Sequence, residues 1–142
     1  MIAFTIPGEP QGKGRPRVGK IGGHARMFTP AKTAAYEGLI AHAAQQAMAG
    51  AAPLECACAV QVSITVSVPR SWSKKKAAAA LLGEVYPTTK PDTDNVVKAV
   101  FDGMNGVVWR DDVQAVDLAV KKRYGATPGV FVRVSPCAGA AA

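Results

Sequence analysis

The chain has 142 residues, a length at which one domain can bury its own hydrophobic core. We expect a single domain over residues 1–137, followed by a disordered tail at 138–142. An excess of 17 lysines and arginines over 10 acidic residues gives a formal net charge of +7, which favours an acidic partner such as nucleic acid. The sequence has no signal peptide or membrane-spanning stretch, and its three cysteines argue against a disulfide framework, so we expect a soluble cytoplasmic protein.

The first part of the chain combines a strand, a cationic segment and a helix. Apolar residues at every second position over 2–6 predict a strand. Residues 12–26 are rich in glycine and cations and have no apolar periodicity, which predicts a long basic loop. Thr and Pro at 29–30 then provide a helix start, and the alanine-rich stretch that follows predicts a helix to about Met48.

The rest of the chain mixes strands and helices without a regular βαβ rhythm. Strict alternation over 60–68 predicts a strand with one buried and one polar face. Helices are predicted over 74–82 and 95–104, and the second has an apolar stripe opposite a charged side. Alternation over 113–124 and again over 130–134 predicts two adjacent strands that form a hairpin. The expected class is α+β, a mixed sheet of about four strands packed with about three helices.

A cluster of carboxylates is the most informative feature for chemistry. Five of the ten acidic residues fall in one short window: Asp92, Asp94, Asp102, Asp111 and Asp112. Pro91 disfavours helical geometry at the residue before it, so we expect Asp92 in extended chain and Asp94 at the helix N-cap. The side chains of these two residues could converge with that of Asp112, which is expected at the start of the next strand.

Such a set of oxygen ligands suits a hard cation. Mg²⁺ prefers a few carboxylates together with waters and substrate phosphate oxygens, and a bound ion would polarise a phosphodiester and help to generate the attacking hydroxide. Lys98, one helical turn after Asp94, could neutralise charge on the phosphate. The alternative is purely structural: Asp94 caps the helix and pairs with Lys98, and Asp111 and Asp112 form a turn. The spacing alone leaves both interpretations open.

A family resemblance favours the first interpretation. The run KPDTDNVVKAVFDGMNG at 90–106, followed by DDVQ at 111–114 and by Lys121, strongly resembles the RusA family of Holliday junction resolvases. The opening strand, the Gly-Lys-Gly-Arg-Pro-Arg segment and the helix with Tyr36 and Glu37 resemble the phage and prophage branch of that family. Two departures are Val96, where leucine is usual, and Gly-Met-Asn at 103–105, where the family more often has alanine and leucine.

The resemblance implies a homodimer that binds four-way DNA junctions and nicks two strands symmetrically with Mg²⁺ or Mn²⁺, in recombination and repair. Carried over position by position, it implies Asp92, Asp94 and Asp112 as metal ligands and Lys98 as the catalytic lysine. Asp102 and Asp111 recur in the motif and are second-tier candidates. Asp102 lies two turns beyond Asp94, and Asp111 should face away from Asp112 if the strand has begun.

Several cations are expected to contact the DNA backbone. They are Lys13, Arg15, Arg17, Lys20, Arg26, Lys90 and Lys121. Two other functions compete with a junction nuclease: a non-enzymatic DNA-binding protein whose aspartates only cap and pair, and a metal-dependent phosphohydrolase that acts on nucleotides. The acidic cluster argues against the first, and the extended cationic segment, larger than a nucleotide requires, argues against the second.

Overall fold

The structure, a computed structural model, describes residues 1–13 and 31–137 in full and the backbone of residues 17–21 and 24–28. Its elements in chain order are β1 Ile2–Pro7, β2 Arg17–Ile21, β3 His24–Phe28, α1 Ala31–Met48, β4 Cys58–Ser67, α2 Lys74–Leu81, α3 Thr93–Met104, the 3-10 turn η1 Asp112–Gln114, β5 Ala115–Gly125 and β6 Gly129–Pro136. One four-stranded mixed sheet and three helices confirm the predicted α+β class. The predicted helix start at 29–30 and the predicted tail at 138–142 lie outside the described residues.

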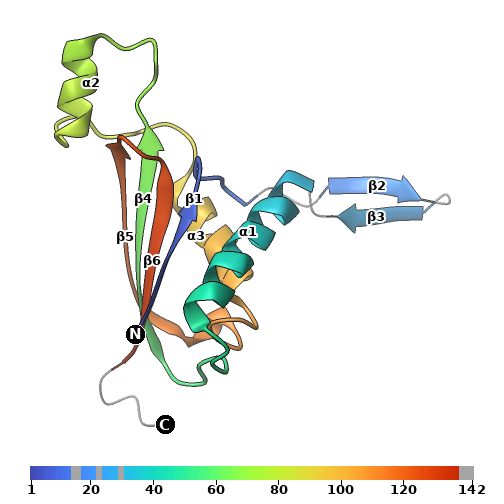
Figure 1. Cartoon of the computed structure of the whole chain (residues 1–142). Coiled ribbons are helices and arrows are strands. Elements are labelled where there is room, and N and C mark those ends of the chain that lie inside the picture. The colour runs from blue at the N-terminus through green and yellow to red at the C-terminus, as the bar shows by residue number, and fades with distance from the viewer. Residues whose placement is uncertain (14–16, 22–23, 29–30, 138–142) are drawn as a thin grey trace.

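The strand order differs from the predicted hairpin. The sheet runs β1, β6, β4, β5, as Figure 1 shows. On β4, Val62 lies opposite Val132 of antiparallel β6 on one side and opposite Val120 of parallel β5 on the other. The prediction that the last two strands are adjacent is therefore wrong, because β4 lies between them. Alternation along a strand tells which face is buried, but it carries no information on which strand is the neighbour.

The core lies between one face of this sheet and helices α1 and α3 (Figure 1). Every second residue of β4 is buried, and α3 contributes an apolar stripe that includes Val96, Val100 and Met104. Trp109, in the segment between α3 and η1, is fully buried at 0% exposure. Burial of each large apolar side chain contributes about 1.5–3 kcal/mol, so this packing holds α3 firmly on the sheet.

Helices α1 and α3 approach closely at Gly103. A Cβ atom built on Gly103 would lie 2.6 Å from the Ile40 side chain and 3.1 Å from the backbone oxygen of Glu37. The alanine common in the family would therefore not fit here without a shift of α1. The close approach also brings the Glu37 side chain toward the charged side of α3, which matters for the site described below.

The basic segment is not a simple loop. Strands β2 and β3 form an antiparallel ribbon in which Arg17 pairs with Phe28 and Ile21 pairs with His24. In Figure 1 this ribbon extends away from the four-stranded sheet, beyond the first turns of α1. The predicted loop over 12–26 is wrong in this part, and the reason is physical. A two-stranded ribbon that stands away from the core has no buried face to impose apolar alternation on its sequence.

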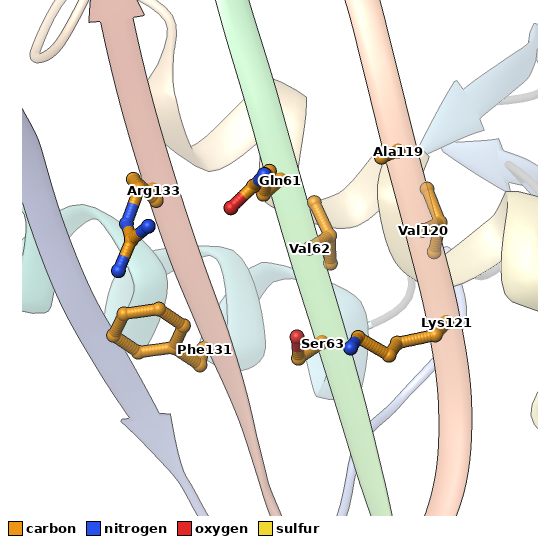
Figure 2. A pocket seen from close by; sticks show the side chains of 8 residues that line it. All are labelled: Gln61, Val62, Ser63, Ala119, Val120, Lys121, Phe131 and Arg133. Atoms are coloured by element: carbon orange, nitrogen blue, oxygen red, sulfur yellow. The ribbon is translucent and has the colours of Figure 1, made fainter.

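The face of the sheet opposite α1 and α3 carries a shallow hollow. Figure 2 shows its eight lining residues on three neighbouring strands: Gln61, Val62, Ser63, Ala119, Val120, Lys121, Phe131 and Arg133. The side chain of Lys121 extends from β5 toward β4, and the Arg133 guanidinium lies 5.9 Å from the centre of the Phe131 ring. This face is thus polar, with an exposed aromatic ring in it.

Two expectations about the chain as a whole can be compared with the described residues. Cys56, Cys58 and Cys137 are all free, in agreement with the absence of a disulfide framework. Burial, with smaller contributions from the other two cysteines, raises the pKa of Cys58 to about 11. Within residues 1–13, 17–21, 24–28 and 31–137, no helix combines the length and apolar character needed to cross a membrane.

Candidate active site

The N-terminus of α3 presents two carboxylates to solvent. Asp92, with φ −68° and ψ 136°, is extended, as predicted, and it occupies the N-cap position, whereas Asp94 lies in the first turn. The predicted N-cap at Asp94 is therefore wrong by two residues, a common error because propensity marks helix ends only loosely. Asp92 makes no side-chain cap hydrogen bond, and both residues are exposed. Among the described residues, neither carboxylate has an ion-pair partner, and both are accessible to a ligand.

The chain before α3 is held by a lysine that the sequence analysis did not single out. Lys122 Nζ donates hydrogen bonds to the backbone oxygens of Thr89, at 2.8 Å, and Pro91, at 2.9 Å. Because neighbouring residues of a strand point to opposite faces, Lys121 lies on the open face of the sheet. The two lysines are distinguished only by the face of β5 on which each lies: Lys121 is exposed and Lys122 is half-buried. The bonds from Lys122 fix the segment that leads into Asp92.

The charged side of α3 carries the predicted catalytic lysine. Lys98 Nζ lies 3.2 Å from Asp102 Oδ1, one turn on, and 4.0 Å from Asp112 Oδ2. Its side chain remains 58% exposed, so a phosphate could reach the ammonium group. The i,i+4 pair proposed in the structural alternative, Asp94 with Lys98, does not occur among the ion pairs of the described residues. Lys98 instead joins Asp102 to Asp112.

A network of hydrogen bonds places Asp112 beside α3. The residue opens the turn η1 and has not entered strand β5, so the predicted strand start is wrong. The amide Nδ2 of Asn105 lies 3.4 Å from Asp112 Oδ2, and Asn105 Oδ1 accepts a hydrogen bond of 2.8 Å from Trp109 Nε1. The position of Asp112 is thus linked to the buried Trp109 through the side chain of Asn105.

Gln114 anchors the other end of the same turn. Its side-chain oxygen accepts hydrogen bonds from the backbone N–H groups of Arg110 and Asp111, at 2.9 and 3.1 Å. Its amide group donates to the backbone oxygens of Leu54 and Cys56, at 2.8 and 3.0 Å. Asp111 itself is extended and exposed, and Asp112 is half-buried. The turn therefore directs the second aspartate of the pair, and not the first, toward α3.

A second cation enters this ionic cluster from the N-terminal part of the chain. Lys13 Nζ lies 2.8 Å from Asp102 Oδ2 and 2.8 Å from Glu37 Oε1. Burial alone would lower the pKa of Lys13, but the hydrogen bonds to Asp102 and Glu37 outweigh it and hold this pKa above its usual value. Burial likewise favours protonation of Asp102, yet bonds from Lys13 and Lys98 hold the pKa of that carboxyl below its usual value. Both groups are charged at neutral pH.

The other predicted DNA contacts are placed less completely. Lys90 is exposed, just before Asp92, and Lys121 is exposed on the open face of the sheet. Arg15 lies outside the described residues, as do the side chains of Arg17, Lys20 and Arg26, whose backbones belong to the β2–β3 ribbon. A DNA contact by these residues stays a prediction.

Comparison with known proteins identifies the family. A model described as endodeoxyribonuclease RusA matches residues 7–135 of the chain. The chain belongs to the RusA family. It is also 40% identical over 139 residues to the uncharacterized protein YqaN of Bacillus subtilis (strain 168), with 94% of each chain covered, which is consistent with the predicted prophage-like branch. The predicted resemblance is confirmed, and membership supports a DNA-cleaving enzyme with DNA as its partner.

The donor set of this RusA-family site suits Mg²⁺ in its chemistry, but it is not a preformed cage. Within the part of the chain that the structure describes, no group of three or more His, Cys, Asp or Glu side chains lies close enough together to hold a metal ion. Asp92, Asp94 and Asp112 offer carboxylate oxygens, and the first two residues are exposed to solvent. Mg²⁺ commonly keeps several waters and uses only one or two carboxylates together with substrate phosphates, so an incomplete protein shell is compatible with it.

Proposed function

We propose that the chain is a Mg²⁺-dependent endonuclease, with Mn²⁺ as an alternative ion, that resolves four-way DNA junctions by paired symmetric nicks. One observation carries the proposal beyond family membership: the Lys98 side chain, 58% exposed, lies between Asp102 and Asp112, at the side of a helix that begins with the exposed carboxylates of Asp92 and Asp94. A protein that only binds DNA has no use for negative charge at the point where phosphate approaches. This arrangement supports hydrolysis.

In this proposal Asp92, Asp94 and Asp112, which form no closed cluster in the free chain, would hold the ion together with waters and phosphate oxygens of bound DNA. The ion would polarise the scissile phosphate and activate a water. Lys98 lies within reach of the same phosphate and stabilises the negative charge that develops on it in the transition state. Asn105 keeps the Asp112 carboxylate oriented. Lys122 keeps the chain before Asp92 in place.

The basic ribbon β2–β3 and the exposed Lys90 are proposed to follow the phosphate backbone of the junction. The formal charge of +7 per chain makes this attraction strong and dependent on salt. Lys121 lies on the opposite face of the sheet from α3. A contact of Lys121 with DNA therefore requires a duplex arm that reaches the open face.

Cleavage assays test the proposal against its two rivals. The protein is incubated with a labelled four-way junction, the matched linear duplex and nucleoside triphosphates, with and without Mg²⁺. We expect nicks only in the junction, at symmetric positions in opposing strands, and only with the ion. Junction binding without nicks under every ionic condition would favour the non-enzymatic DNA-binding protein, and release of phosphate from the nucleotides would favour the phosphohydrolase.

Paired nicks require two active sites, and the chain supplies one set of aspartates and no repeat. We therefore propose a two-fold dimer. Val108 and Trp109 are 0% exposed in the single chain, so neither side chain can contribute to the interface. The open face with Phe131 is the better candidate, since this ring is 37% exposed in the single chain. Lys121 lines the same hollow, so a dimer formed through this face would exclude its contact with DNA.

Sedimentation equilibrium at micromolar concentration is expected to give twice the chain mass of 14.7 kDa. Phe131→Asp should shift the protein toward the monomer and convert paired nicks into single ones, because it replaces an apolar ring at the interface with a charged group that must lose its water on association. Leu82→Asp is the matched control, since Leu82 is 76% exposed at the end of α2 and should leave the dimer intact. A wild-type monomer, both free and bound to a junction, contradicts paired cleavage.

A further inference from the structure

Lys13 has contacts that its expected role in DNA binding does not explain. Its side chain is only 24% exposed, and its ammonium group lies between Glu37 of α1 and Asp102 of α3. Its backbone N–H also donates a hydrogen bond of 3.0 Å to the backbone oxygen of Asn95. A lysine that reaches out to a phosphate backbone would be exposed and free of acidic partners. Lys13 instead joins the N-terminal segment to both helices.

The backbone around Lys13 fits closely against α3. A Cβ atom built on Gly12 would lie 2.9 Å from the Cβ of Asn95, so a larger residue at position 12 would push this segment away from the helix. On the other side of the cluster, the close contact of Gly103 with Ile40 brings α1 near enough for Glu37 to reach Lys13. Two glycines thus set the distances at which the Lys13 ammonium meets its carboxylates.

The oxygens of Asp102 are divided between two lysines. Oδ2 lies 2.8 Å from Lys13 and Oδ1 lies 3.2 Å from Lys98. The same Lys98 ammonium lies 4.0 Å from Asp112. Removal of the Lys13 charge would leave Asp102 with Lys98 as its only cationic partner in the described residues. The net electrostatic pull on Lys98 toward Asp102 would then increase, because the Lys13 charge would no longer offset that of Asp102 and would no longer repel the Lys98 ammonium.

We propose that Lys13 is a positioning residue for the cleavage reaction: by neutralising Asp102 it prevents that carboxylate from capturing Lys98, which stays available to Asp112 and to the scissile phosphate. The inference rests on the proposed nuclease function and assigns to Lys13 a role inside the site, in place of a contact with the DNA backbone.

The first test compares binding with cleavage. Lys13→Met should lower the single-turnover cleavage rate at saturating junction by about 10–100-fold, the range typical of residues that orient a site's own ligands. Junction affinity without divalent ion, and the slope of its salt dependence, should stay as in the wild type. Lys32→Met, an exposed lysine in the first turn of α1, is the matched control and should leave the rate unchanged. Lys13→Arg keeps the charge and should retain most of the activity.

The second test asks whether Lys13 acts through Asp102. In the double variant Lys13→Met with Asp102→Asn, position 102 carries no charge that could capture Lys98, so the cleavage rate should recover to within about threefold of Asp102→Asn alone, the coupling expected of groups in one network. A lysine that only stabilises the fold predicts no recovery. A lysine that contacts phosphate predicts an unchanged rate at saturation and a salt slope smaller by about one unit. Either result overturns the proposal.

A structural measurement keeps the inference separate from the proposed function. In crystals of Lys13→Met, Lys98 Nζ is expected to move toward Asp102 and to lie beyond the present 4.0 Å from Asp112. An unchanged distance between Lys98 and Asp112 overturns the inference, whether or not the wild-type protein cuts junctions. Failure of the wild-type protein to cut junctions contradicts only the proposed nuclease function. Should Lys13→Met fail to fold, as judged by circular dichroism, Lys13→Gln retains a hydrogen-bonding amide without charge and carries the same expectations.

Discussion

Changing Asp92, Asp94 or Asp112 singly to Asn is expected to reduce junction cleavage by about a thousandfold or more, because each change removes an anionic ligand from the proposed ion and weakens charge stabilisation in the transition state. Junction affinity should be unchanged or tighter, since negative charge near phosphate is lost. Binding is measured by electrophoretic mobility shift without divalent ion. Cleavage is measured under single-turnover conditions with Mg²⁺.

The structure supplies controls for this prediction. Asp117→Asn, which changes an exposed residue of strand β5, should leave both binding and cleavage as in the wild type. Asp111→Asn should have a much smaller effect than Asp112→Asn, since Gln114 directs only the second aspartate toward α3. If the three site variants lost binding and cleavage together and showed an unfolded circular dichroism spectrum, the aspartates would have a structural role. The absence of a side-chain cap bond at Asp92 argues for a folded variant.

The parts of the fold that could be predicted are the elements whose apolar residues recur at regular spacing in the sequence. The strand over Cys58–Ser67 and the helix over Thr93–Met104 each bury one face. Apolar residues therefore recur at every second position in the strand and at every third or fourth position in the helix. Pairing between strands depends on contacts far apart in the chain, which periodicity does not record. For this reason β4, β5 and β6 were each expected, while the insertion of β4 between the other two was not.

The same division holds for the candidate site. Asp92, Asp94 and Lys98 lie within two turns of one helix, so their proximity could be predicted from spacing. The contacts of Lys13 with Asp102 and of Lys122 with Pro91 join residues far apart in sequence, and no local sequence pattern predicts them. Which of Lys121 and Lys122 reaches the chain before α3 depends on which face of β5 packs on the core, and the sequence of β5 alone does not reveal that face.

Trp109 is the second position at which a large effect is expected. The side chain is fully buried and packs edge-on against Phe101 with ring centres 5.0 Å apart. Trp109→Ala should lower the free energy of unfolding by about 3–5 kcal/mol, the usual cost of emptying an aromatic site in a core. Because domains of this size are stable by only about 5–15 kcal/mol, this change should remove a large share of the total stability. Urea unfolding followed by far-ultraviolet circular dichroism measures the loss.

Trp109→Phe separates the packing role of this residue from its role in the site. Phenylalanine retains much of the apolar volume, but it cannot donate the hydrogen bond that Trp109 gives to Asn105. The free energy of unfolding should fall by only about 1–2 kcal/mol. Cleavage should nevertheless drop by about tenfold, because Asn105 is then free to turn away from Asp112. Trp72→Phe, beside α2 and Tyr124, changes the other tryptophan and should leave cleavage intact. If Trp109→Phe cleaves junctions at the wild-type rate, Asn105 does not need this bond to orient Asp112, and the tryptophan serves the core alone.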